Sequence, residues 1–344
     1  MQALSPPPVC RGVGDNTVRL ETALTNTTRT LALKLRAHIK AAFLAGVVLL
    51  GPTSALAQTV TTYATGAYAG SSMSFDSSGA LIVSGLNAQD VYRVPPGGGE
   101  ATVFVTRSSG VGEAVIGPDN SLYTVVEGGM VARYAPGSTT PDATPYATGV
   151  TTYRFNSLVF DSAGRLYVIG LGSSDRNVYR APIGGGAATV FGSLPDGAIA
   201  GAIAVGPGGE VFVSEQASRS VLKIAPSGGQ STIFATGVGI GTGLAVARNG
   251  DVYVNDYFNG LIRRVPASGG TGVVIATIAD QPYGLTLRGD KLYASAFDSG
   301  YVYQVALPSE PAPVPTMTEW AMILFSMMLA GGAVLHLQRR RQFA

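Results

Sequence analysis

The sequence contains only one cysteine, two histidines and one tryptophan among 344 residues, and none of them lies between residues 58 and 307. Cys10 has no partner for an intramolecular disulfide and no second thiol for a metal or redox site. His38 and His336 lie near the two ends. Residues 58–307 therefore lack the groups for Ser-His-Asp or Cys-His catalysis and for histidine-bound zinc or iron. Their chemistry depends on carboxylates, amides, hydroxyls, tyrosines and a few arginines and lysines.

Charge is also scarce, because only 13% of the residues are charged while 46% are hydrophobic. This composition is typical of a folded chain and not of a disordered one. The formal net charge is +2, but residues 58–307 carry 14 Lys and Arg against 17 Asp and Glu, a net charge of −3. The central part has no basic surface of the kind that binds nucleic acid, so no nucleic-acid partner is predicted.

Residues 1–57 are predicted to be a long N-terminal lead followed by a secretory signal peptide. Its apolar run, 41–50, is too short to span a bilayer, and Ala55-Leu56-Ala57 is a small-residue cleavage site for signal peptidase. Three basic residues precede the run: Lys34, Arg36 and Lys40. The alternative, a core helix, has no need for the small-residue end.

A hairpin pattern recurs every 40 to 45 residues along the central part. In the clearest copy, the runs 244–246 and 252–254 flank an Asn-Gly turn, and two further predicted strands follow at 261–265 and 273–277. The corresponding turn positions are Gly79, Asn120, Gly164, Gly209, Gly250 and Asp290. Four strands per unit at this period predict a β-propeller, and six units predict an all-β domain of six blades over residues 58–307.

The two ends of this domain carry matching pieces of one unit. The fourth strands end in similar short sequences at 144–149 and 232–237, and a similar sequence is found at 61–66. The last unit, by contrast, stops after its third strand near Leu307. We therefore expect residues 59–66 to complete the blade begun by residues 283–307, which closes the ring. The alternative is an unpaired N-terminal extension. Between third and fourth strands, proline is followed by glycines at 95–99, 182–186, 226–229 and 266–270.

The C-terminal part changes character after Leu307. Residues 308–319 form a proline-rich linker with a sorting motif, and proline favours an extended spacer there. Residues 320–344 are predicted to be a transmembrane helix and a basic cytoplasmic end, because 320–337 has no formal charge and is 18 residues long. The flanking cations are Arg339, Arg340 and Arg341. A buried soluble helix is the alternative.

Segment 314–320 reads Val-Pro-Thr-Met-Thr-Glu-Trp, and with the apolar run and the arginines it resembles the IPTL-CTERM sorting signal of Gram-negative bacteria. The family consensus is Ile-Pro-Thr-Leu-Ser-Glu-Trp. Four residues match it in place, namely Pro315, Thr316, Glu319 and Trp320. The resemblance implies recognition by an exosortase-type membrane transpeptidase. It also implies export across the inner membrane, with membrane anchoring and a periplasmic propeller before display at the cell surface or release.

Residues 58–307 resemble the NHL and SMP-30/gluconolactonase-like group of six-bladed propellers in the short sequence motifs at 243–246 and 251–256. For the lactonases, the resemblance implies a metal held at the channel mouth by Glu, Asn and Asp from the innermost strands. The positions just before these strands are Ser71, Gly112, Asn156, Gly201, Thr242 and Tyr283. Only Asn156 offers a suitable ligand. Glu113 is a second ligand candidate, but it lies one residue away from this register, and one residue along a strand turns a side chain to the opposite face.

Carboxylates that follow the second strands are further candidates: Glu127, Asp175, Glu215, Asp256 and Asp298. Glu215 and Asp256 are predicted to hold equivalent places in adjacent blades and to face a ligand together, or else each caps a turn. Binding of Ca²⁺ or another divalent cation is left as an alternative, because hard cations can be held by oxygen ligands alone. Four aromatic residues near the same rim suggest either a sugar- or peptide-stacking surface or packing between blades. They are Tyr257, Phe258, Tyr283 and Phe297.

The sequence favours an exported, envelope-sorted propeller that acts as a non-enzymatic binding or scaffold module for a glycan, peptide or small molecule. The alternative is a secreted metal-dependent hydrolase of the lactonase type. Lactone turnover that depends on a chelatable divalent cation distinguishes the two.

Overall fold

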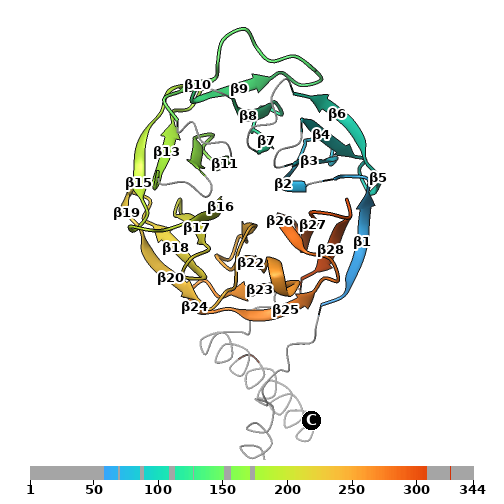
Figure 1. Ribbon diagram of the computed structural model, residues 1–344, viewed down its shortest axis with the longest axis vertical. Helices are drawn as coiled ribbons and strands as arrows, with labels where there is room; N and C mark the ends of the chain where they lie inside the picture. Colours follow the sequence, from blue (N-terminus) through green and yellow to red (C-terminus); the bar gives the residue numbers. More distant parts are fainter. Residues whose placement is uncertain are drawn as a thin grey trace, which may run out of the picture. The chain divides into compact units, whose positions relative to one another are not determined.

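The computed structural model describes residues 58–68, 70–85, 89–107, 113–126, 128–150, 156–170, 175–307 and 326. Its strands form six antiparallel sheets arranged in a ring, each with its first strand innermost (Figure 1). The predicted all-β, six-bladed propeller is confirmed. Among the described residues no helix has the length and apolar character to cross a membrane, and the predicted span 320–337 lies outside them apart from Ser326. The predicted signal peptide also lies outside them.

In blades 1 to 5 the strands follow in chain order from the centre outward. Blade 1 contains β2 (Gly70–Phe75), β3 (Leu81–Gly85), β4 (Asp90–Val94) and β6 (Thr102–Thr106). Blade 2 contains β7 (Ala114–Ile116), β8 (Leu122–Val126), β9 (Met130–Tyr134) and β10 (Ala147–Thr148). Blade 3 contains β11 (Asn156–Phe160), β12 (Leu166–Gly170), β13 (Asn177–Ala181) and β15 (Thr189–Ser193).

Blade 4 contains β16 (Ala200–Val205), β17 (Val211–Glu215), β18 (Ser220–Ile224) and β20 (Thr232–Thr236). Blade 5 contains β21 (Leu244–Val246), β22 (Val252–Asp256), β23 (Leu261–Val265) and β25 (Val273–Thr277). Its second and third strands are joined by a short 3-10 helix, η1 (Tyr257–Asn259). Blade 6 contains β26 (Pro282–Arg288), β27 (Lys291–Ala296), β28 (Val302–Ala306) and β1 (Val60–Thr65).

The hairpin turns between first and second strands have a local cause. In blade 1 the Asp76 carboxylate accepts hydrogen bonds from the backbone N–H groups of Ser78 and Ala80, each at 2.9 Å. Gly79 adopts φ +89°, a conformation that favours glycine. Arg93, two strands away, contacts the same carboxylate at 2.9 Å. Asp161 forms the same turn in blade 3.

The hydrophobic core is divided into six clusters, one between each pair of neighbouring blades. Blades 3 and 4, for example, bury Tyr167 and Ile169 against Val213 and Leu222. The central residues of the second strands are therefore buried on both faces, as the all-buried pattern of β12 shows. This explains why runs of consecutive apolar residues, such as 81–83, 211–213 and 252–254, occur in these strands without alternating polar residues.

Two-residue strands connect the blades at their outer edge. They are β5 (Gly99–Glu100), β14 (Gly186–Ala187), β19 (Gly229–Gln230) and β24 (Gly270–Thr271), and each pairs in parallel with the outermost strand of the preceding blade. The sequence predicted only a turn at these positions. The glycine turns thus also carry the backbone pairing between blades.

The ring closes as predicted. β1 pairs antiparallel with β28, with Val60 opposite Val305. At the start of this strand, the Gln58 N–H donates to the Ile275 carbonyl of blade 5 at 2.8 Å. Between blades 3 and 2, the Gly186 N–H donates in the same way to the Tyr146 carbonyl at 2.8 Å. The N-terminal segment therefore replaces both the fourth strand and the outer interblade contact.

Candidate functional site

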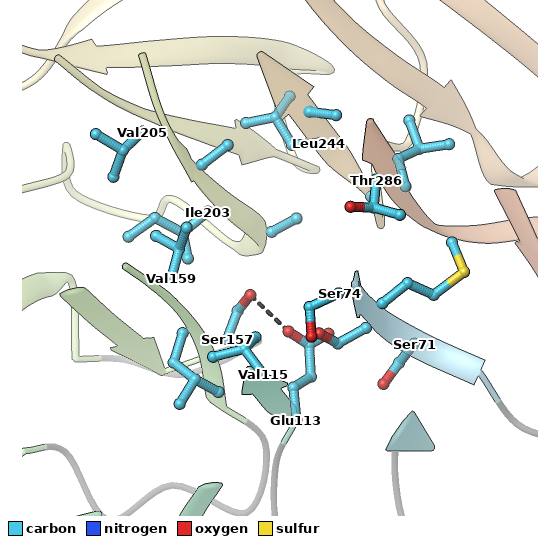
Figure 2. Close-up of a pocket in the computed structure, with 18 of the residues that line it drawn as sticks. Ser71, Ser74, Glu113, Val115, Ser157, Val159, Ile203, Val205, Leu244 and Thr286 are labelled. Atoms are coloured by element: carbon cyan, nitrogen blue, oxygen red, sulfur yellow. Dashed lines mark hydrogen bonds between the residues drawn. The ribbon is translucent and has the colours of Figure 1, made fainter. Parts of the chain in front are cut away.

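A cavity of about 290 Å³ lies at the centre of the ring, lined by first strands of the blades. Most of its lining is apolar, including Val115, Val159 and Leu244. Its polar groups are serine and threonine hydroxyls and one carboxyl group, that of Glu113 (Figure 2). A mainly apolar cavity with a few convergent polar groups is the usual form of a small-ligand site.

Glu113 immediately precedes β7, and its side chain points into this cavity toward Ser157 (Figure 2). The Ser157 hydroxyl donates to its carboxyl oxygen at 2.6 Å. Glu113 is only 3% exposed, and this burial raises its pKa to about 8 even though hydrogen bonds with Ser157 and Ser71 act in the opposite direction. The carboxyl is thus mainly uncharged at neutral pH and can donate as well as accept a hydrogen bond.

The expectation that its one-residue offset turns Glu113 away from the channel was wrong. β7 begins at Ala114, so Glu113 lies before the strand, where side chains need not alternate between two faces. Neighbouring first strands also shift register near this end, between Gly70 and Ser72 and between Ala200 and Ala202. A count of residues along an ideal strand therefore fails at the channel mouth.

A second polar group at the channel mouth was missed by the sequence argument. Asn255 is fully buried, and its side-chain oxygen accepts from the N–H groups of Thr242 and Gly243 at 3.0 and 2.7 Å. Its amide donates to the Thr242 hydroxyl at 2.7 Å and to the Tyr283 carbonyl at 3.1 Å. Asn255 thus ties blade 5 to blade 6.

Serines occupy the same place on other second strands. Ser295 accepts from the Gly284 N–H at 2.9 Å and donates to the Gly70 carbonyl at 2.8 Å. Ser84 accepts from the Ala114 N–H at 2.8 Å. A polar residue stands three positions after the first buried residue of the second strand at Ser84, Ser214, Asn255 and Ser295, and that signal could have identified this network.

Glu215 is held by its own loop and by the segment that precedes β16. Its carboxylate accepts from the N–H groups of Ile199, Ala217 and Ser218 at 2.9, 2.8 and 2.7 Å. Burial alone would raise the pKa of Glu215, but these hydrogen bonds hold it below its ordinary value. The geometry is that of the alternative interpretation, a turn cap.

The other predicted carboxylates that the structure describes belong to three different blades. Asp256, 3% exposed, accepts from the Asn259 amide at 2.9 Å and lies 3.9 Å from Arg263. Asp298 is exposed in the link between β27 and β28. Asp175 accepts from the Tyr179 hydroxyl at 2.9 Å. Glu127, the side chain of Asn156 and the tail residues Pro315, Thr316, Glu319, Trp320, Arg339, Arg340 and Arg341 lie outside the described part.

The described residues supply only part of the donor set of a lactonase-type metal centre. In the described part of the chain, no three Asp, Glu, His or Cys side chains come together. Among the described residues that line the cavity, Glu113 offers the one carboxyl group, and its raised pKa favours the uncharged form. Ser71, Ser157 and Thr242 beside it offer neutral hydroxyls.

Glu113→Gln is expected to flatten the dependence of stability on pH. Between about pH 4.5 and 8 the unfolded chain loses this proton while the folded chain keeps it, so the free energy of unfolding of the wild type should fall as pH rises through this window. Urea titrations at pH 5 and pH 9 measure this loss, which glutamine should reduce. Equal losses in both proteins would show that Glu113 ionises normally.

Residues 312–341 match the family model of the IPTL-CTERM motif. The predicted sorting signal is confirmed, and it marks the protein as exported, sorted to the cell envelope and handled by an exosortase-type system. The match covers the tail and does not concern the propeller.

Solved structures with a similar fold include a gluconolactonase from Xanthomonas campestris, with a TM-score of 0.60 and 12% identity over 75% of this chain and 94% of that chain. The calcium-binding protein regucalcin from Agrobacterium tumefaciens aligns with a TM-score of 0.56 and 13% identity, over 73% and 98%. Virginiamycin B lyase from Staphylococcus aureus gives 0.52 and 12%, over 73% and 99%. No sequence match was found among curated proteins. At these identities the likeness shows the fold alone.

Proposed function

We propose that the protein is an exported propeller, sorted to the envelope through its tail, that acts as a binding or scaffold module and not as a hydrolase. The observation that carries this proposal is the single, largely uncharged carboxyl group of Glu113 in a cavity otherwise lined by hydroxyls and apolar side chains. Such a cavity can hold a small polar ligand by hydrogen bonds. Among its described residues we identify no base and no metal-ligand set for attack on a carbonyl group.

An activity and metal screen on residues 58–307 tests the proposal. This part forms a closed ring with its own interblade cores, so it is suitable for the assay. We expect no lactone turnover above the blank with Ca²⁺, Mg²⁺, Mn²⁺ or Zn²⁺, and no change in melting temperature on addition of chelator. Turnover that needs a metal and disappears in Glu113→Gln would instead establish the lactonase-type alternative, which the gluconolactonase fold keeps open.

The tail should direct two separable steps. Replacing Arg339, Arg340 and Arg341 with glutamates is expected to misorient the predicted span, because cytoplasmic cations set its orientation. Replacing Pro315 or Trp320 with alanine should leave insertion intact and prevent processing. Cell fractionation and intact-mass analysis follow both steps, and the mature chain should begin at Gln58. Wild-type protein that still carries Ala344 in cells containing the sorting enzyme would contradict processing.

A further inference from the structure

Four aromatic residues form a continuous arc from the channel mouth to the rim of blades 5 and 6. Tyr283, near the start of β26, lies with its ring centroid 5.5 Å from that of Tyr257 and 5.0 Å from that of Phe297. Phe258 continues the series, 5.0 Å from Tyr257. First strands begin and second strands end at this face of the ring, which is why the start of β26 meets residues from the links that follow β22 and β27. We call these four residues the aromatic arc.

The outer end of the aromatic arc is held firmly and faces solvent. Phe258 is 66% exposed although it sits in the short helix η1. The Tyr257 N–H donates to the Ile240 carbonyl at 3.1 Å, and Gly260 ends the turn in the left-handed conformation at φ 66°. A Cβ at Gly260 would lie 2.6 Å from the Ile278 carbonyl oxygen, so the turn packs directly against the end of β25, the outermost strand of its own blade. The Phe258 side chain is mostly exposed and contributes little to packing, whereas the backbone of the turn that carries it is held in place by these contacts.

Polar groups beside the aromatic arc are amides and carboxylates. Asn259 is exposed, and its amide nitrogen donates to Asp256 at 2.9 Å. Exposed Asp298 adds to the effect of burial in raising the pKa of Tyr257. At the inner end, burial and, to a smaller extent, Glu113 raise the pKa of Tyr283 to about 12. The hydroxyl of Thr242, which lines the cavity, donates to the Tyr283 carbonyl at 3.0 Å, and this contact places the arc beside the cavity. In the described part of the chain, the only cation in these contacts is Arg263, near Asp256.

We propose that the aromatic arc binds a neutral polysaccharide chain, with one sugar ring on Phe258 and the chain directed toward Tyr283 and the cavity. The C–H face of a pyranose ring packs on an aromatic face, whose negative potential attracts it. Asn259 and Asp298 supply acceptors for neighbouring sugar hydroxyls. Because the acidic groups are uncompensated by cations other than Arg263, they disfavour polyanionic chains. This inference rests on the proposed binding function and names its ligand class.

Affinity gel electrophoresis of residues 58–307 with dextran, laminarin and galactomannan, and with alginate as the polyanionic comparison, tests the proposal. At least one neutral polysaccharide should retard the wild type, and alginate should not. Phe258→Ala should weaken this retardation about 10-fold, a loss of about 1.4 kcal/mol in binding, while Phe258→Trp keeps it. Ile183→Ala is the matched control, because Ile183 is also 66% exposed but lies in the link between β13 and β15.

Melting temperatures of all variants check that binding losses do not come from unfolding. The inference is overturned if no neutral polysaccharide retards the protein, or if Phe258→Ala and Ile183→Ala bind like the wild type. Retention on a basic-peptide resin alone, lost in Phe258→Ala, would identify a peptide partner, so the binding function would stand while the glycan inference would fall. Metal-dependent lactone turnover would overturn the proposed function without changing the polysaccharide result.

Discussion

Replacing Gly185 with alanine is expected to lower the free energy of unfolding by roughly 3–5 kcal/mol, among the largest losses from a single added methyl group. Gly185 adopts φ +92°, and a Cβ there would lie 2.1 Å from the carbonyl oxygen of Tyr146 in the preceding blade. Backbone cannot move aside as a flexible side chain can. The added methyl should therefore separate β14 from β10, which pair at Ala147 and Gly186. Urea denaturation at constant pH measures the loss.

Gly184 provides a matched control for this experiment. It also has a positive φ, +81°, but a Cβ there would meet nothing within 4 Å. Gly184→Ala should therefore cost only the conformational strain, about 1–2 kcal/mol. The pair Gly98 and Gly97 repeats the contrast in blade 1, where the close atom is the Tyr63 carbonyl oxygen at 2.2 Å. Equal losses at Gly184 and Gly185 would show that strain, and not the interblade approach, explains the shape of the turn that recurs in several blades.

The outer contacts show what the repeat could and could not predict. Period, turn chemistry and strand positions followed from the sequence, because hairpin turns depend on local residues such as Asp76 and Gly79. The parallel pairing of Gly186 with Ala147 joins residues from different blades. No local pattern encodes it, since it appears only when the ring brings neighbouring blades together.

The same limit applies to the candidate site. Glu215 and Asp256 end β17 and β22, yet the Glu215 carboxylate is occupied by backbone N–H groups of its own loop and of the segment before β16. Glu113 was kept as a candidate against an alternation argument that holds only inside a regular strand, and it lines the cavity because it precedes one. Bulges and strand ends at the channel mouth thus decide which side chains reach the site.

The fourth strand of blade 6 is the place where the two ends of the propeller meet. Val305 pairs with Leu292 as Val265 pairs with Val252, so β28 corresponds to β23. Thr61 lies opposite Gln304 as Val273 lies opposite Arg264. By this register Gln58 takes the place of Gly270, the first residue of β24. In blade 5, residues 266–269 lie between the third strand and β24. By the same register, Ala306 and Leu307 correspond to positions 266 and 267, and no described residue before Gln58 in the blade 6 arrangement corresponds to positions 268 and 269.

Deleting residues 58–66 should prevent the propeller from remaining a stable monomer. The deletion removes the β1–β28 ladder, the buried Ala64 and the contact of Tyr63 with Tyr293 at 4.8 Å. It leaves β28 as an open edge strand, which favours pairing with another chain, and we expect a loss of more than about 4 kcal/mol together with aggregation. A permuted chain that starts at Ala67 and joins Leu307 through Ser-Gly to Gln58–Gly66 has the link length of blade 5 and should recover monomer and stability. Size-exclusion chromatography and urea titration compare the three proteins, and a deletion variant as stable and monomeric as the full ring would refute closure by β1.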